Sequence, residues 1–142
     1  MGERTGQDPW AADKAAVKQS LGYTESGNDY GITNPWGYMG KYQFGRDRLS
    51  DLGYGGVSNA DFIGDEGLQE RTMDASLAAM DREIASRGLD KYEGTTVGGV
   101  PVNRRALYAM MHLGGAGGTN KFLLQSVKVK RLRTSRQTCK TP

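Results

Sequence analysis

A single carboxylate, Glu25, stands where a helical pattern gives way to a long loop. Residues 10–24 are predicted to form a helix on which Val17 and Leu21 stand four residues apart, and Glu25 is the next step along that face. A carboxyl group on a core-facing stripe is partly desolvated, which favours its protonated form. A general acid that gives a proton to a leaving oxygen requires such a protonated carboxyl group, so a general acid is one interpretation of Glu25. The alternative is an ordinary solvent-exposed carboxylate at a helix end.

The loop that follows, up to Gly45, is rich in glycine, amides and aromatic rings. Its polar side chains include Asn28, Asp29 and Asn34, and its aromatic side chains include Tyr30, Trp36 and Tyr38. Flat apolar faces beside a few polar groups are the usual composition of a small-ligand cleft, and they suit sugar rings that carry hydroxyl and acetamido groups. The alternative interpretation is an ordered connecting loop whose aromatic rings cap the core.

Three segments in order resemble motifs of the lysozyme-like lytic transglycosylases and goose-type lysozymes. They are Glu25-Ser26, the segment Gly37-Tyr38-Met39-Gly40-Lys41-Tyr42-Gln43, and the helix end from Ala106 to Gly118. The Tyr-Gln-Phe-Gly ending of the second segment is typical of phage-associated or secretion-associated members. The resemblance implies a mainly α, lysozyme-like fold with a glycan-binding cleft between a helical lobe and a loop or hairpin segment. It also implies a bacteriolytic glycosidase that cleaves peptidoglycan between N-acetylmuramic acid and N-acetylglucosamine.

The resemblance makes Glu25 the catalytic acid and places further residues around the glycan. The substrate-binding residues expected from the motifs and the loop composition are Ser26, Tyr30, Asn34, Met39, Tyr42, Gln43, Tyr108 and His112. Two departures affect the expected cleft contacts: His112 stands where the family has tyrosine, and Lys41-Tyr42 replaces the commoner Leu-Met.

A hydrolase of the two-carboxylate type would need a second acid across the scissile bond. Asp29 and Asp47 are the nearest candidates. A transglycosylase needs none, because the 6-hydroxyl of the sugar attacks and one carboxyl group acts first as acid and then as base. The sequence leaves these two products open.

The other predicted elements are mainly helical. We expect a short helix at 45–54, a linker at 61–64, an amphipathic helix at 66–87, a loop or weak hairpin at 92–102, and helices at 103–113 and 120–124. Asp8 and Pro9 suit the N-cap and the first position of the first helix. The glycines between Leu113 and Thr119 lack the form of a phosphate-binding loop and are predicted to end a helix.

Length and charge predict one domain, 1–125, followed by a basic and disordered tail, 126–142. The resemblance implies that this domain is a lysozyme-like catalytic domain. The net charge of +3 is due to the tail, because residues 125–142 carry six basic residues and no acid, which leaves 13 basic and 16 acidic residues in the first 124 positions. Cys139 and His112 are single residues of their types, so we expect no disulfide, no metal and no cofactor.

No apolar run is long enough for a membrane span, and no Sec leader is apparent. Work in the periplasm or cell wall would then require lysis, a virion, dedicated secretion or a longer chain. The expected partner is the peptidoglycan strand, with a virion or secretion apparatus as a further candidate. Two other hypotheses are a catalytically inactive, peptidoglycan-binding or structural component of such an apparatus and a nucleic-acid-binding protein. The acidic body makes nucleic acid the least favoured partner.

Overall fold

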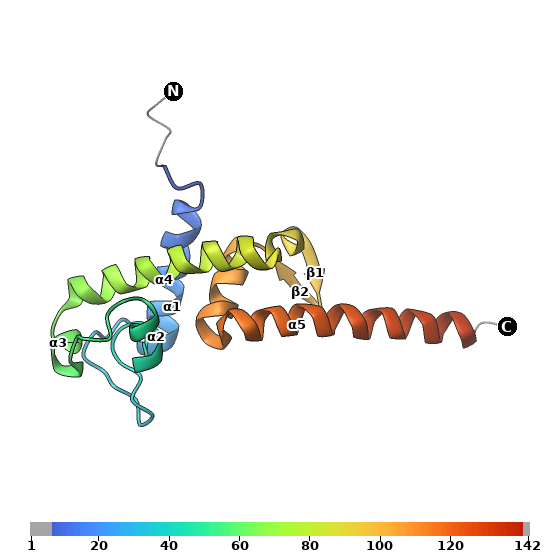
Figure 1. Ribbon diagram of the computed structural model, residues 1–142. Coiled ribbons are helices and arrows are strands. Elements are labelled where there is room, and N and C mark those ends of the chain that lie inside the picture. Colours follow the sequence, from blue (N-terminus) through green and yellow to red (C-terminus); the bar gives the residue numbers. More distant parts are fainter. Residues whose placement is uncertain (1–6, 141–142) are drawn as a thin grey trace. The chain divides into compact units, whose positions relative to one another are not determined.

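The computed structural model describes the backbone of residues 7–140 and the side chains of residues 7–124 (Figure 1). The protein is mainly helical, as predicted, with one small two-stranded sheet. It divides into two compact units, Met1–Asp81 and Arg82–Pro142, and the boundary falls inside the helix α4. Each unit is described by itself below.

The first unit contains α1 (Ala11–Ser26), α2 (Arg46–Asp51), α3 (Asn59–Ile63) and most of α4 (Glu66–Arg87). The predicted helix at 66–87 is confirmed. The predicted linker at 61–64 was wrong, because Ser58 caps a short helix there by accepting the N–H of Asp61 at 3.1 Å. The predicted cap of the first helix was also wrong. The Asp8 carboxylate instead accepts the N–H of Trp10 at 2.8 Å, and the helix begins one residue later.

Aromatic and apolar side chains from the loop and the helices form the core of the first unit. The rings of Tyr42 and Phe44 meet edge to face at 6.4 Å between centroids, and those of Phe44 and Phe62 at 6.2 Å. The α4 stripe that periodicity predicted as core is buried, with Met73 and Leu77 fully enclosed. The core therefore joins the loop to the long helix.

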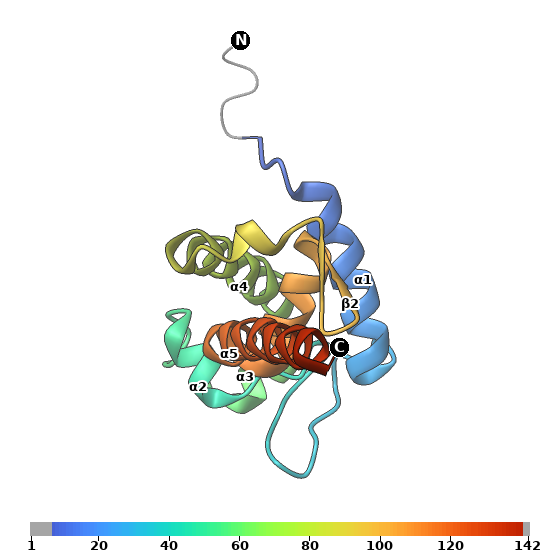
Figure 2. The same cartoon turned by 90° about the vertical axis from the view of Figure 1, so that its right-hand side faces the viewer.

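The segment between α1 and α2 has no regular element. Figures 1 and 2 show it as a chain that turns back on itself. Isolated antiparallel bridges pair Thr33 with Met39 and Met39 with Phe44, so two tight turns follow each other. We call residues 27–45 the site loop.

The second unit begins with the end of α4, followed by the short helix η2 (Leu89–Tyr92) and a hairpin of β1 (Thr95–Val97) and β2 (Val100–Val102). The strands are antiparallel, with Thr95 opposite Val102. The weak hairpin predicted in this region is thus confirmed. Val97 and Val102 turn inward, while the residues before them on each strand are exposed.

The last helix, α5 (Arg104–Lys140), is two helices merged across a kink at Gly115, whose φ of 75° and ψ of 167° are not helical. Figure 2 shows its second part nearly end on. The glycine-rich stretch thus interrupts the helix at one residue, where the sequence predicted a longer break. The backbone of α5 continues to Lys140, a region predicted to be a disordered tail. Its side chains from residue 125 onward lie outside the described residues.

No helix in the described part of the chain is long and apolar enough to cross a membrane, as the sequence predicted.

Candidate functional site

Glu25 lies in the last turn of α1, on a half-buried position. Gly27 ends the helix in the left-handed conformation, and Asn28 follows with φ of 65°. Their N–H groups donate to the carbonyl oxygens of Tyr23 and Gly22 at 2.8 and 2.9 Å. The chain therefore turns sharply just after the carboxylate. The Glu25 carboxylate makes no hydrogen bond or ion pair with any residue whose side chain is described.

Ser26 connects the end of α1 to the site loop. Its Oγ lies 2.7 Å from the carbonyl oxygen of Lys41 and 3.1 Å from that of Gly22, and it accepts the N–H of Asp29 at 3.0 Å. A single hydroxyl thus joins three backbone groups at the point where Glu25 leaves the helix. The sequence predicted a substrate contact for Ser26, and that prediction stays untested.

The first turn of the site loop presents two aromatic rings to solvent. Asn34 Oδ1 accepts the N–H groups of Trp36 and Tyr38, both at 2.9 Å, and so fixes the turn. Trp36 is 81% exposed and Tyr38 is 47% exposed. Large aromatic side chains exposed on one turn are typical of a binding surface. Asn34 builds this turn with its carbonyl oxygen, whereas the sequence assigned it to substrate.

Met39, Tyr42 and Gln43 lie in the second turn of the site loop. Met39 and Tyr42 are each 1% exposed, so they pack beneath the loop in this structure. Gln43 has φ of 58°, and its side-chain amide donates to the carbonyl oxygen of Gly40 at 2.9 Å. The sequence expected these residues to line the cleft. In the structure they give the loop its shape.

A cluster of side chains around Glu70, on α4, binds the site loop. The sequence did not predict this cluster. The Glu70 carboxylate accepts hydrogen bonds from Tyr30 at 2.6 Å and Tyr42 at 2.9 Å, and it pairs with Lys41 at 3.0 Å and Lys18 at 3.1 Å. Two of these donors, Tyr30 and Tyr42, were predicted to bind substrate. Here they bind a carboxylate of the protein itself.

These contacts keep Glu70 ionised. Partial burial acts to raise its pKa, but the hydrogen bonds from Tyr30, Lys41, Lys18 and Tyr42 outweigh that effect and lower the pKa to about 2. Burial and the bond to Glu70 raise the pKa of the Tyr42 hydroxyl. For Lys18 and Lys41, burial lowers the pKa, but their carboxylate partners produce a net rise. The cluster is therefore a set of fixed charges at neutral pH.

Gln69, the neighbour of Glu70, is 1% exposed and joins α4 to two other segments. Its Oε1 accepts the N–H of Lys41 at 2.9 Å, and its Nε2 donates to the carbonyl oxygens of Tyr30 at 3.0 Å and Phe62 at 3.1 Å. A signal for this role exists in the sequence. Gln69, Thr72 and Ser76 follow helical spacing beside the apolar stripe of α4, and all three are buried.

The two candidates for a second acid are both exposed. Asp29 Oδ1 accepts the N–H of Gly31 at 2.8 Å and so belongs to a turn of the site loop. Asp47 lies in the first turn of α2, where a helix N-terminus favours negative charge. Each therefore has a structural role that requires no substrate.

Tyr108 and His112 belong to the second unit. Tyr108 is fully buried, and the Arg104 guanidinium lies over its ring at 6.0 Å. His112 is half-buried near the kink in α5. The third motif thus belongs to the second unit and the first two motifs belong to the first unit, and the expected contact of Tyr108 and His112 with substrate stays a prediction.

No group of three or more histidine, cysteine or acidic side chains within residues 7–124 could hold a metal ion. No family model matches the chain, and neither a curated protein nor a solved structure matches it.

Proposed function

We propose that the protein cleaves the β-1,4 glycosidic bond between N-acetylmuramic acid and N-acetylglucosamine in peptidoglycan, with Glu25 as the proton donor. The observation that carries the proposal is a contrast between two carboxylates of the first unit. Glu70 is saturated by four donors, whereas half-buried Glu25 has none among the described side chains. Two carboxylates in such different environments can serve different roles.

In this mechanism Glu70 holds the site loop in its conformation, and Glu25 transfers the proton. The carboxyl oxygens of Glu25 are available to a ligand, since no described residue uses them. The helix end and the Ser26 hydroxyl hold the residue at the base of the site loop. Preorganisation of this kind lowers the entropic cost of bringing the acid to the scissile oxygen.

The proposed reaction balances with one carboxyl group. Glu25 gives its proton to the glycosidic oxygen as the bond between this oxygen and the anomeric carbon of the N-acetylmuramic acid breaks. The 6-hydroxyl oxygen of the same muramic acid then forms the new bond at that carbon, and its proton passes to the Glu25 carboxylate. The product carries a 1,6-anhydro ring and no water is consumed. Hydrolysis through Asp29 or Asp47 is the alternative outcome.

The exposed rings of Trp36 and Tyr38 support a saccharide as the substrate. Pyranose rings offer apolar faces that stack on aromatic side chains, while their edges bond to polar groups. The hydrogen bonds from Asn34 fix the backbone of the turn that carries both aromatic residues. A lysozyme-like arrangement, with the third motif completing the cleft, is part of the proposal, as is action in the periplasm or cell wall.

Digestion of purified peptidoglycan sacculi tests the proposal. Wild type, Glu25→Gln and the control Glu66→Gln are compared, and the released muropeptides are identified by mass spectrometry. Glu66 is an exposed glutamate of the same unit, so its change controls for loss of a negative charge. We expect release by wild type and Glu66→Gln, and none by Glu25→Gln.

The product masses separate the remaining possibilities. Anhydro ends, one water lighter than reducing ends, identify a transglycosylase. Reducing ends identify a muramidase and direct mutagenesis to Asp29 and Asp47. If wild type releases nothing, or Glu25→Gln releases as much as wild type, the proposal is wrong, and a catalytically inactive component of a virion or secretion apparatus takes its place.

A further inference from the structure

The two units carry opposite net charges. Residues 1–81 contain 7 basic and 13 acidic residues, whereas residues 82–142 contain 12 basic and three acidic residues. The formal charges are therefore −6 and +9. A charge asymmetry of this size indicates that the second unit faces an anionic partner that the first unit does not.

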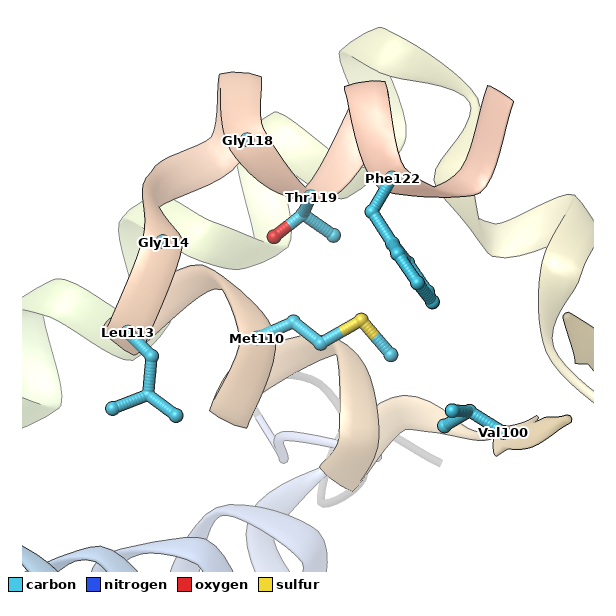
Figure 3. Close-up of a pocket in the computed structure, with 7 residues that line it drawn as sticks. All are labelled: Val100, Met110, Leu113, Gly114, Gly118, Thr119 and Phe122. Atoms are coloured by element: carbon cyan, nitrogen blue, oxygen red, sulfur yellow. The ribbon is translucent and has the colours of Figure 1, made fainter. Parts of the chain in front are cut away.

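An apolar pocket of about 390 Å³ lies within the second unit, at the kink of α5. Its lining consists of Val100, Met110, Leu113, Gly114, Gly118, Thr119 and Phe122. In Figure 3 the side chains of Met110 and Phe122 extend toward the same space, with Val100 beside them. The Thr119 hydroxyl donates to the Gly115 carbonyl oxygen at 2.9 Å, so the pocket's one polar side chain is already used inside the helix.

Large apolar side chains surround this pocket in exposed positions. Leu113 is 66% exposed and Phe122 is 37% exposed, and Leu124 is exposed just beyond the pocket. Lys121 is exposed between them in sequence, and residues 125–142 add six basic residues and no acidic one. Exposed apolar residues and positive charge thus occur together in α5, on both sides of its kink for the apolar residues and after the kink for Lys121 and the basic residues beyond it.

We propose that the second unit binds the surface of a membrane that contains anionic lipids. The exposed apolar residues enter the acyl region, the pocket takes an apolar segment of a lipid, and the net positive charge of the unit attracts the anionic headgroups. Apolar and cationic residues on one helix are the combination that interfacial helices use. Clustered basic residues add attraction to anionic headgroups.

Two other occupants fit the observations less well. Nucleic acid would use the positive charge, but its interfaces are strongly polar and offer nothing to the exposed apolar residues. A second copy that pairs through the same pocket on each chain would bring two strongly positive units together, and like charges repel. An anionic membrane surface satisfies both the charge and the apolar pocket.

Co-sedimentation with lipid vesicles tests the proposal on the full chain. One set of vesicles is phosphatidylcholine alone, and the other contains phosphatidylglycerol as well. We expect binding to the anionic vesicles and little to the neutral ones, with affinity falling as salt is added. No peptidoglycan is present, so this result is independent of the proposed glycosidase activity.

Two kinds of variant separate the apolar and the charged contributions. Phe122→Ser is expected to weaken vesicle binding at every salt concentration. If circular dichroism shows that this variant does not fold, Leu113→Ser is used in its place. The matched control is Ile32→Ser, an aliphatic residue of the first unit that is 42% exposed. Replacing Lys128, Lys130 and Arg131 by glutamine should weaken binding by roughly a hundredfold at low salt, about fivefold for each charge. Arg71→Gln is the matched charge control.

Four results would overturn the proposal. One is equal binding to neutral and anionic vesicles. A second is that folded Phe122→Ser and Leu113→Ser bind the anionic vesicles as wild type does. A third is tighter binding to duplex DNA than to anionic vesicles, with Phe122→Ser unaffected, which would assign the surface to nucleic acid. The fourth is a wild-type dimer that Leu113→Ser converts to a monomer, which would assign the pocket to a second copy.

Discussion

The side-chain carbonyl oxygen of Gln69 accepts the backbone N–H of Lys41 at 2.9 Å, across 28 residues of sequence. This bond holds the site loop against α4 at the residue that follows Gly40. The Gln69 carboxamide fills the space where a Gly40 side chain would stand, with its Cδ only 2.7 Å from the position of an added Cβ. Backbone and side chain therefore approach each other as closely as glycine permits.

Gly40→Ala is expected to destabilise the protein by about 2–4 kcal/mol, because the new methyl group displaces Gln69 and the left-handed backbone is strained as well. Gly40 has φ of 77°. The matched control is Gly37→Ala, where φ is 88° but an added Cβ meets nothing within 4 Å. That change should cost only the backbone term, about 1 kcal/mol. Urea unfolding monitored by circular dichroism measures both, and equal losses would contradict the role of Gln69.

Ser26→Ala is expected to destabilise the protein by about 1–2 kcal/mol, because it leaves the Asp29 N–H and the Lys41 carbonyl without their shared partner. Ser26 is half-buried at the junction of α1 and the site loop. Ser20→Ala, an exposed serine on the same helix, should change the free energy of unfolding by less than about 0.5 kcal/mol. Hydrogen exchange should also rise in residues 27–45 of Ser26→Ala alone. Unchanged exchange there would show that Ser26 does not hold the loop.

The sequence predicted those elements whose signal is local and repeated. The α4 stripe of Met73, Leu77, Met80 and Ile84 repeats over three turns, and all four residues are buried. The helix α3 was missed because five residues are too few for a periodic pattern to emerge. The kink at Gly115 was predicted only as a stretch of glycines, since composition does not tell which of several glycines departs from helical geometry.

Of the candidate site, the sequence predicted the residue with a local signal and missed the cluster that joins distant segments. Glu25 stands out because it directly precedes a loop of unusual composition. The Glu70 cluster joins residues of α1, the site loop and α4, and such long-range pairs leave no spacing to recognise in a single sequence. Tyr30 and Tyr42 were therefore assigned to substrate by their residue type. Only the fold reveals that their hydroxyls bind Glu70.

Glu70→Gln is expected to destabilise the protein by about 1–2 kcal/mol, a value reduced for the partial solvent exposure of the cluster. The change removes the negative charge that Lys18 and Lys41 share and leaves both cations close together. The control Glu83→Gln breaks an exposed i,i+4 pair with Arg87 and should cost less than about 0.5 kcal/mol. The urea midpoints of the three proteins at neutral pH provide the test. A Glu70→Gln midpoint equal to that of Glu83→Gln would mean that the cluster contributes no net stability.

The contribution of Glu70 to stability should also depend on pH in a defined direction. Its pKa is lowered from an ordinary 4.5 to about 2, so between these values the unfolded chain binds more protons than the folded chain. Stability from Glu70 is thus complete above pH 4.5 and is lost as the pH falls toward 2. At the alkaline end, the pKa of Lys41 is raised above 10.5, so its contribution is complete below that value and disappears as the pH rises through the higher folded pKa.

The measurement is the difference in urea midpoint between wild type and Glu70→Gln over a series of pH values. We expect this difference to be constant near neutrality and to shrink as the pH falls below the ordinary glutamate pKa. Below that pH, wild type loses the stabilisation that comes from the ionised Glu70 carboxylate, whereas Glu70→Gln lacks this stabilisation at every pH. Glu83→Gln is measured over the same pH series as the control for loss of one exposed carboxylate of α4. A difference that stays constant down to the acid limit would show that the four donors do not hold Glu70 ionised.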